Sequence, residues 1–156
     1  MTLPVREDIL REIHQRLTKV TQSGAAVTVL RNPKVPPKIR DLPAISILFE
    51  EDELANSDFG GDYPEHTCKW PIVVIPYMLG SDGTDETAEI EIHGYCDDVR
   101  RELWRNGSTL SNKCTYLYQA GWGLLIKPQL GEAGIGLPMN LVAVYTENLE
   151  RLYENY

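Results

Sequence analysis

Residues 84–105, TDETAEIEIHGYCDDVRRELWR, carry two competing patterns, and the choice between them decides the fold. Apolar side chains recur at steps of three and four positions, which predicts an amphipathic helix; they are Ala88, Ile92, Tyr95, Cys96, Val99 and Leu103. Within the same stretch, residues 89–92 alternate like a strand, and Gly94 weakens a helix. The helical pattern covers more positions, so we expect one long helix of about 33 Å at ~1.5 Å per residue.

A second amphipathic helix is predicted over residues 5–20, VREDILREIHQRLTKV, because its apolar side chains also fall on one stripe. Thr2 and Pro4 suit the start of this helix, and Gly24 stands just beyond its expected end. His14 lies near the edge of the apolar stripe, and we interpret it as a structural residue.

Short apolar runs before and after the long helix predict strands; they cover residues 26–30, 43–49, 68–78, 114–120, 123–126 and 141–145. Pro71 and Pro76 are expected to interrupt or border the third run. The next two runs are expected to form a hairpin, and the glycine-rich residues 131–136 a flexible connection. This order predicts an α+β fold, with a largely antiparallel or mixed sheet and two helices packed on one face. The length of 156 residues favours a single domain, 1–156.

The charge is strongly uneven along the chain. There are 23 acidic and 15 basic residues, giving a net charge of −8. Residues 1–40 contain eight bases and three acids, residues 50–65 seven acids and no base, and residues 81–105 eight acids and three bases. A dedicated nucleic-acid binder would normally carry a basic surplus, so that class is disfavoured. The blocks instead describe surfaces and partners.

A basic, proline-rich arm is predicted at residues 31–43, because prolines at 33, 36 and 37 exclude a helix or a central strand. We consider two interpretations, a solvated connection and a stiffened arm that lies on an acidic neighbour. For the second, the candidate interface residues are Arg31, Lys34, Lys38 and Arg40.

A long acidic loop is predicted at residues 50–66. Its first residues are Glu50, Glu51, Asp52 and Glu53, which could form a solvated rim, a docking surface or a Mg²⁺ or Ca²⁺ site. Their spacing matches no EF-hand. Residues 147–156 could form a C-terminal tail, and Tyr153 and Tyr156 would then anchor it on another subunit.

Motifs of catalysis and metal binding are missing from the sequence, which contains no G-x-S-x-G, no H-E-x-x-H, no P-loop and no dinucleotide fingerprint. Cys68, Cys96 and Cys114 form no C-x-x-C and are expected to be reduced and mostly buried, with an interchain disulfide as the alternative. His66 and Cys68 are too few ligands for a structural zinc site. We therefore predict no catalytic residue, metal or cofactor.

The sequence shows no targeting signal, and we therefore expect the protein to be made and kept in the cytosol. No apolar stretch approaches the ~18 residues that cross a membrane. The first residues, MTLPVRED, lack the basic segment and apolar run of a signal peptide.

Several segments in series resemble a known family. They are REDILREI at 6–13, VTVLRN at 27–32, a proline-bearing link, DLPAISI at 41–47 followed by an acidic run, an apolar strand at 70–77, DVRREL at 98–103 and a final strand. In order and length, over most of residues 5–145, the chain resembles the tail terminator proteins of long-tailed bacteriophages. The loop at 50–66 is longer and more acidic than this family pattern, and the aromatic tail has no clear counterpart in it.

The resemblance implies a small α/β protein that assembles as a homo-oligomeric, six-fold ring. Such a ring caps the finished tail tube, ends its polymerisation and joins it to the neck. The implied location is the virion, with assembly in the host cytoplasm, and the implied partners are the tail tube protein and the neck or connector proteins. Genomic DNA would pass through without specific binding, which an acidic lumen would assist. The alternatives are another head–tail connector or neck completion protein, a metal-dependent enzyme using the acids of residues 50–65, and an unrelated interaction domain.

Overall fold

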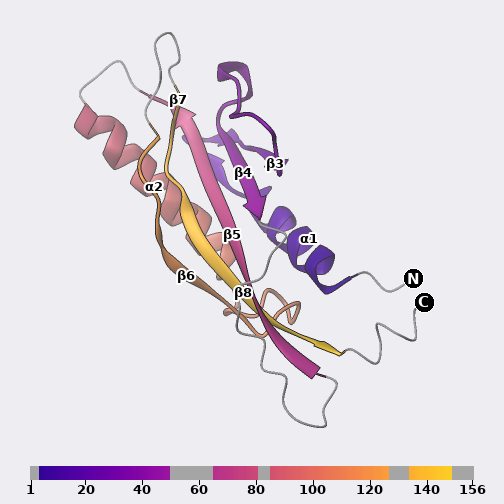
Figure 1. Cartoon of the computed structure of the whole chain (residues 1–156). Coiled ribbons are helices and arrows are strands. Elements are labelled where there is room, and N and C mark those ends of the chain that lie inside the picture. Colours follow the sequence, from indigo (N-terminus) through magenta and orange to yellow (C-terminus); the bar gives the residue numbers. More distant parts are fainter. Residues whose placement is uncertain (1–3, 50–64, 81–84, 127–133, 149–156) are drawn as a thin grey trace.

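A mixed six-stranded sheet forms the centre of the fold in the computed structural model, which describes residues 4–49, 65–80, 85–126 and 134–148. The strands are β3 (Thr28–Arg31), β4 (Ala44–Phe49), β5 (Glu65–Leu79), β6 (Tyr116–Trp122), β7 (Gly134–Gly136) and β8 (Met139–Asn148). Their spatial order is β3-β4-β5-β8-β6, with β7 paired to the end of β5 (Figure 1). The β3–β4 pair is parallel and the other pairs are antiparallel.

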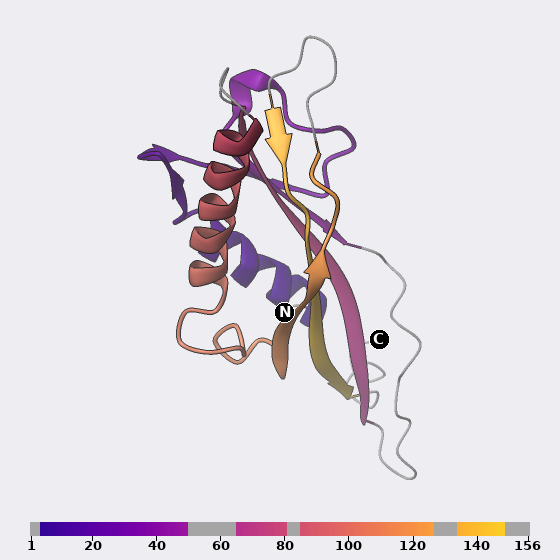
Figure 2. The same ribbon diagram turned by 90° about the vertical axis from the view of Figure 1, so that its left-hand side faces the viewer.

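Two helices, α1 (Val5–Leu17) and α2 (Asp85–Leu103), cover the same face of this sheet (Figure 2). Arg6 at the start of α1 donates a hydrogen bond to the Tyr145 hydroxyl at 2.7 Å and lies 4.8 Å from the centre of the Trp70 ring. Trp104, just after α2, donates its indole N–H to the Leu117 carbonyl at 2.9 Å. The predicted α+β fold with two helices on one face is therefore confirmed.

The long helix is confirmed over residues 85–103, and its packing explains why the strand pattern fails. A strand would place Ile90 and Ile92 on one face, yet Ile92 is fully buried and Ile90 is 66% exposed. The predicted stripe forms the buried side of α2, with Tyr95, Cys96, Val99 and Leu103 beside Ile92. The chain leaves the helix through Asn106 and Gly107, which have positive φ values of 63° and 109°.

The first helix is shorter than predicted, because α1 ends at Leu17 instead of residue 20. The next residues form a small hairpin of β1 (Thr21–Gln22) and β2 (Ala25–Ala26). Its two turn residues, Ser23 and Gly24, have positive φ values of 51° and 78°, which the primed turns of tight hairpins require. Gly24 thus turns a hairpin and does not end the helix, and the predicted strand 26–30 is divided between β2 and β3.

The apolar run 68–78 lies inside the longer strand β5, and its prolines are placed where little pairing is lost. The Pro76 carbonyl accepts a hydrogen bond from the Leu137 amide at 3.2 Å, so both the carbonyl and the nitrogen of Pro76 face the side of β7 and β8. On that side no strand residue needs a donor at this point, because β7 ends at residue 136 and β8 begins at residue 139. Pro71 lies an odd number of positions before Pro76, and the backbone groups of successive strand residues point to alternate sides, so the Pro71 nitrogen faces β4. There, pairing with β4 ends at Ile72.

The predicted hairpin between residues 114–120 and 123–126 is wrong. Residues 116–122 form one strand, β6, which continues past a register shift at Gly121 and pairs with β8. In the later run, Ile126 forms only an isolated bridge with Gly136. A glycine next to an aromatic residue is compatible with a turn or a bulge, and here it is a bulge.

Three predicted loop boundaries also change. Residues 134–136 of the expected flexible connection form β7. The last residues of the predicted acidic loop, 65 and 66, belong to β5, and residues 147 and 148 of the predicted tail belong to β8.

Candidate assembly surfaces

The basic arm (residues 31–43) is fastened to the sheet at both ends. The Asn32 amide donates to the Ile47 carbonyl at 2.6 Å, and the Pro43 carbonyl accepts from the Thr28 amide at 3.0 Å. Between these points the chain is irregular apart from a 3₁₀ turn, Ile39–Asp41. The arm thus leaves and rejoins the sheet on its β3 side, at the upper right in Figure 1.

The charged side chains of the arm behave in two ways. Lys34, Lys38 and Arg40 are exposed, and none forms an ion pair with another residue of the described part of the chain. Two apolar side chains stand among them, Val35 at 65% exposed and Ile39 at 47%. The arm therefore offers free positive charge together with apolar surface.

Arg31, the fourth candidate of the arm, is held within its own chain. It is the last residue of β3, and its guanidinium donates two hydrogen bonds, of 2.7 and 2.5 Å, to the Glu7 carboxylate of α1. Arg11 adds a third contact to Glu7 at 3.3 Å. The bonds from Arg31 lower the pKa of Glu7 to about 2, and Glu7 in turn raises the pKa of Arg31. The role of Arg31 in the fold is to tie β3 to α1.

An acidic surface lies on the outer side of α2. Glu86 and Glu89 are exposed beside the exposed Ile90, and Glu91, also exposed, lies on the side of the helix that faces the pocket described below. In the described part of the chain none of the three acids has an ion pair. Farther along the helix the acids are neutralised locally, because Asp97 pairs with Arg100 at 3.6 Å and Asp98 with Arg101 at 2.9 Å. Free negative charge is therefore concentrated in the first half of α2.

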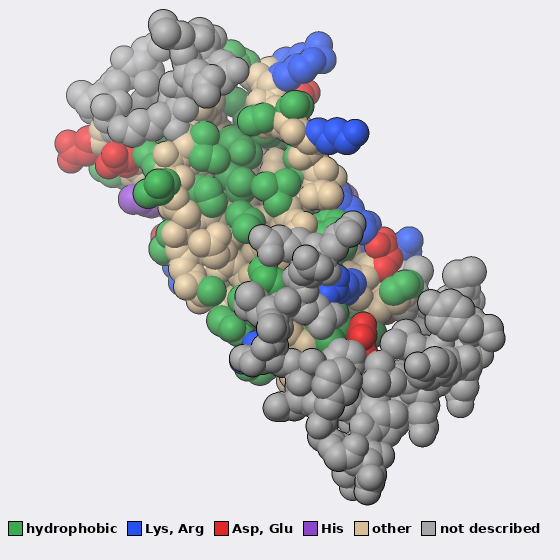
Figure 3. Space-filling model, viewed as in Figure 1, with side chains coloured by type: hydrophobic (Ala, Val, Ile, Leu, Met, Phe, Trp, Pro, Cys, Tyr) green, Lys and Arg blue, Asp and Glu red, His purple; other side chains and the backbone are tan. Residues whose placement is uncertain are grey.

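The sheet face opposite the helices, which we call the open face, is also apolar. The strand registers place on it the apolar side chains of Leu30, Ala44, Leu48, Pro71, Val73, Ile75, Tyr77, Tyr118, Val142 and Val144, among the polar residues Thr28, Ser46, Thr67, Asn140 and Thr146. Ala44, Ile75, Tyr77, Val142 and Val144 are buried in the protomer, and the other apolar side chains of this face are half-buried. Lys69 is the one charged side chain among the strand residues whose side chains are described on this face. Hydrophobic side chains gather over its centre in Figure 3. The sheet is thus apolar on both sides.

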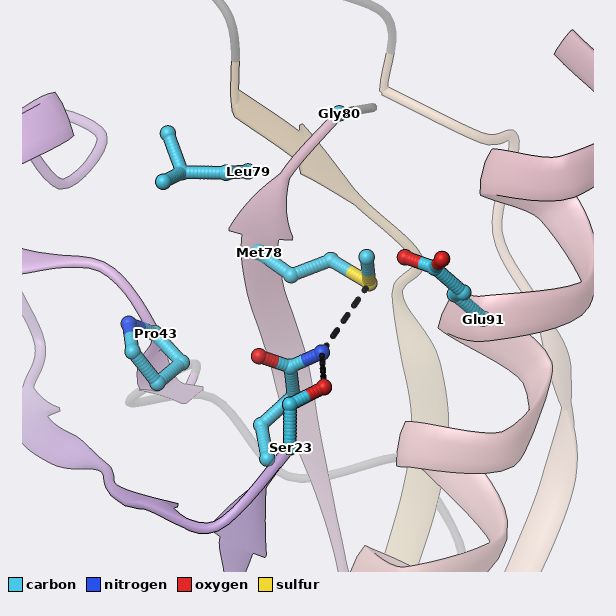
Figure 4. Close-up of a pocket in the computed structure, with 7 residues that line it drawn as sticks. Ser23, Pro43, Met78, Leu79, Gly80 and Glu91 are labelled. Atoms are coloured by element: carbon cyan, nitrogen blue, oxygen red, sulfur yellow. Dashed lines mark hydrogen bonds between the residues drawn. The ribbon is translucent and has the colours of Figure 1, made fainter. Parts of the chain in front are cut away.

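A pocket of about 270 Å³ lies between the small hairpin, the end of β5 and α2 (Figure 4). Its lining is Gln22, Ser23, Pro43, Met78, Leu79, Gly80 and Glu91. The Gln22 amide nitrogen is 3.1 Å from the Ser23 hydroxyl and 4.0 Å from the Met78 sulfur. Glu91 is the one carboxylate of the lining, and Ser23 has no histidine beside it that could activate its hydroxyl.

The three cysteines are free and buried, as the sequence predicts. Burial raises the pKa of the Cys96 thiol to about 12 and that of Cys114 to about 11. These thiols are therefore protonated near neutral pH and are poor nucleophiles. Within the residues that the structure places, no three His, Cys, Asp or Glu side chains meet as a metal site requires.

The remaining site predictions fall outside the described residues. They concern Glu50, Glu51, Asp52 and Glu53 in the acidic loop, and Tyr153 and Tyr156 in the tail. No helix of the described ranges combines the length and the apolar character that crossing a membrane requires.

Two features were missed by sequence reasoning. The apolar character of the open face is one, although the unbroken apolar run 70–78 is the pattern of a strand buried on both sides. Arg16 is the other. Its buried guanidinium pairs with Glu12 at 3.0 Å and donates to the carbonyls of Leu103 at 3.0 Å and Arg105 at 2.8 Å, at the end of α2. No local pattern reveals a contact between residues so far apart in sequence.

The comparisons with known proteins leave the chain without an assigned family: no protein-family model matches it, and no curated protein is similar in sequence.

Proposed function

We propose that this chain is a virion structural protein that forms a ring, caps the tail tube of a bacteriophage, ends its polymerisation and joins it to the neck. The order and lengths of the segments that resemble tail terminator proteins support the proposal. The observation that carries it is the apolar character of the open face, opposite the two helices, where Leu48, Pro71 and Val73 are only half-buried in the protomer.

An apolar face of this kind favours an assembly subunit. Antiparallel sheets commonly present one apolar face to the core and one polar face to water. Here the face opposite the helices carries Val73, Ile75 and Val142, and Lys69 is its one charge among the described strand side chains. Ile75 and Val142 are already buried in the protomer, whereas Leu48, Pro71 and Val73 keep part of their apolar surface in contact with solvent. Contact with other subunits is the expected use of that remaining apolar surface.

Passage of DNA through the ring is consistent with the net charge of −8. A lumen lined by acids would repel phosphates and let the genome slide without sticking. A lumen lined mainly by Lys and Arg in an image of the assembled particle would contradict this part of the proposal.

The test is to remove the chain from the phage that encodes it and to image the products. Tails of variable, excessive length with unattached heads are expected, because nothing would stop the tube. Normal, joined particles would overturn the proposal. Tails of uniform length that fail to join heads would instead favour the alternative, a connector or neck completion protein.

A further inference from the structure

We propose that the basic arm (residues 31–43) of one protomer docks on the outer side of the first half of α2 in the next copy of this chain. We call that surface the α2 acidic surface and define it by Glu86, Glu89 and Ile90. The inference rests on the proposed function, because it names the contact that would close the ring.

Charge complementarity is the first argument. Three arginines of the two helices form ion pairs within the chain: Arg11 with Glu7, Arg16 with Glu12, and Arg100 with Asp97. The two proposed surfaces are different, since in the described part of the chain neither Lys34, Lys38 and Arg40 nor the acids of the α2 acidic surface have an ion pair. Unmatched charges of opposite sign on one chain fit a second copy of that chain.

Exposed apolar side chains accompany the charges on both surfaces. Val35 and Ile39 stand in the arm, and Ile90, 66% exposed, stands beside the acids of the α2 acidic surface. An apolar centre with charges around it is the usual anatomy of a protein interface.

The positions of the two surfaces fit a ring. The arm follows β3 at one edge of the sheet. The end of α2 contacts the opposite edge strand β6, because Arg100 lies 5.8 Å from the Trp122 ring centre and Trp104, just after the helix, bonds to Leu117. In Figure 3, acidic side chains protrude at the upper left margin and Lys and Arg side chains at the upper right. Two different surfaces on opposite sides of a protomer give head-to-tail contacts, which form closed rings when the rotation allows.

The experiment reverses the charges on each surface and measures the mass in solution by light scattering. One variant carries Lys34→Glu and Lys38→Glu, and the other carries Glu86→Lys and Glu89→Lys. Each is expected to fall about sixfold in mass, from the ring to the 17.7-kDa protomer. The matched control, Lys19→Glu with Lys113→Glu, changes two exposed lysines outside both surfaces and should keep the mass of the unmodified chain.

Recombining the reversed charges gives the decisive result. An equimolar mixture of the two variants is expected to restore the ring. The acidic arm of the first variant faces the basic α2 surface of the second, and the unchanged basic arm of the second faces the unchanged acidic surface of the first. The chain with all four substitutions should also assemble. Circular dichroism first establishes that every variant is folded.

Each result has a distinct meaning. If the unmodified chain assembles and both variants keep its mass, the proposed contact is wrong and the proposed function stands. If the folded variants separate into protomers and neither the mixture nor the fourfold variant reassembles, the pairing of these two surfaces is overturned. If the unmodified chain itself runs at 17.7 kDa, both the contact and the ring fail.

Discussion

Glu7 joins α1 to the edge strand β3, because its carboxylate receives hydrogen bonds from both Arg31 and Arg11. These partners hold the pKa of Glu7 near 2, below its ordinary value of 4.5. A carboxyl with a depressed pKa in the folded state stabilises the fold above its unfolded pKa, and this contribution is lost as the pH falls.

We predict that the stabilisation from Glu7 is complete above pH 5 and disappears between about pH 4.5 and pH 2. The measurement is the urea midpoint of the unmodified chain and of Glu7→Gln from pH 6 to pH 2. The unmodified chain should be more stable at pH 6, and the difference should vanish near pH 2. A difference that is constant over this range would show that Glu7 does not titrate with folding.

Arg16 fixes the end of α2 against α1, and its loss should be costly. Replacement by Met leaves the carbonyls of Leu103 and Arg105 without their donor, and leaves Glu12 without its partner. We expect Arg16→Met to lower the free energy of unfolding by about 2–4 kcal/mol. Arg16→Lys should recover only part of this, since one ammonium group cannot replace the forked guanidinium.

The control for Arg16 is Arg101→Met, because Arg101 is 72% exposed and pairs with Asp98 on the surface. Its effect should stay within about 0.5 kcal/mol. Equal losses in the two variants, measured by urea unfolding, would refute the special role of Arg16.

The two glycines at and after α2 provide a matched comparison for this helix. Gly94 lies inside the helix and Gly107 follows it with a φ of 109°, and an added Cβ would meet nothing within 4 Å at either position. An added methyl group therefore has room at both positions, and the two positions differ only in backbone conformation, which is helical at Gly94 and has a positive φ at Gly107. We expect Gly94→Ala to stabilise the protein by about 0.5–1 kcal/mol. We expect Gly107→Ala to destabilise it by about 1–2 kcal/mol. Thermal unfolding measures both, and stabilisation by both changes would contradict the assignment of these conformations.

The sequence could predict the elements whose pattern is long. Over residues 84–105 the helical period outweighs four residues of alternation, and the burial of Ile92 with exposure of Ile90 confirms the choice. It could not predict the path of residues 114–126, because Gly121 is compatible with both a turn and a bulge. Only pairing with β8, which comes later in the chain, selects the bulge.

The candidate surfaces follow the same division. The free charges of the arm could be predicted, because prolines exclude regular structure and lysines close by in the sequence then lie on an exposed segment. The engagement of Arg31 with Glu7 could not, since it depends on where α1 lies relative to β3. The open face also depends on register, because in a run such as 71–77 apolar residues occupy both alternating sets and only the strand pairing shows which set faces away from the helices.

A protomer with an apolar open face and two unmatched charged surfaces should gain stability from assembly. Partners that bind only the folded state raise its apparent stability by mass action. For a ring of this chain, each tenfold rise in protein concentration should raise the thermal midpoint by roughly 2–4 °C. The Lys34→Glu, Lys38→Glu variant should show no such dependence, because its protomers would stay separate.

Salt gives the second half of this prediction. The proposed contact depends on exposed charges, which are screened beyond about 8 Å at physiological ionic strength and beyond about 3 Å at 1 M. Raising the salt should therefore weaken the concentration dependence of the unmodified chain, and should leave the variant unchanged. Differential scanning fluorimetry over a hundredfold range of concentration measures both effects. A midpoint of the unmodified chain that is independent of concentration at low salt would mean that assembly does not stabilise the protomer, and that its apolar open face is tolerated without a partner.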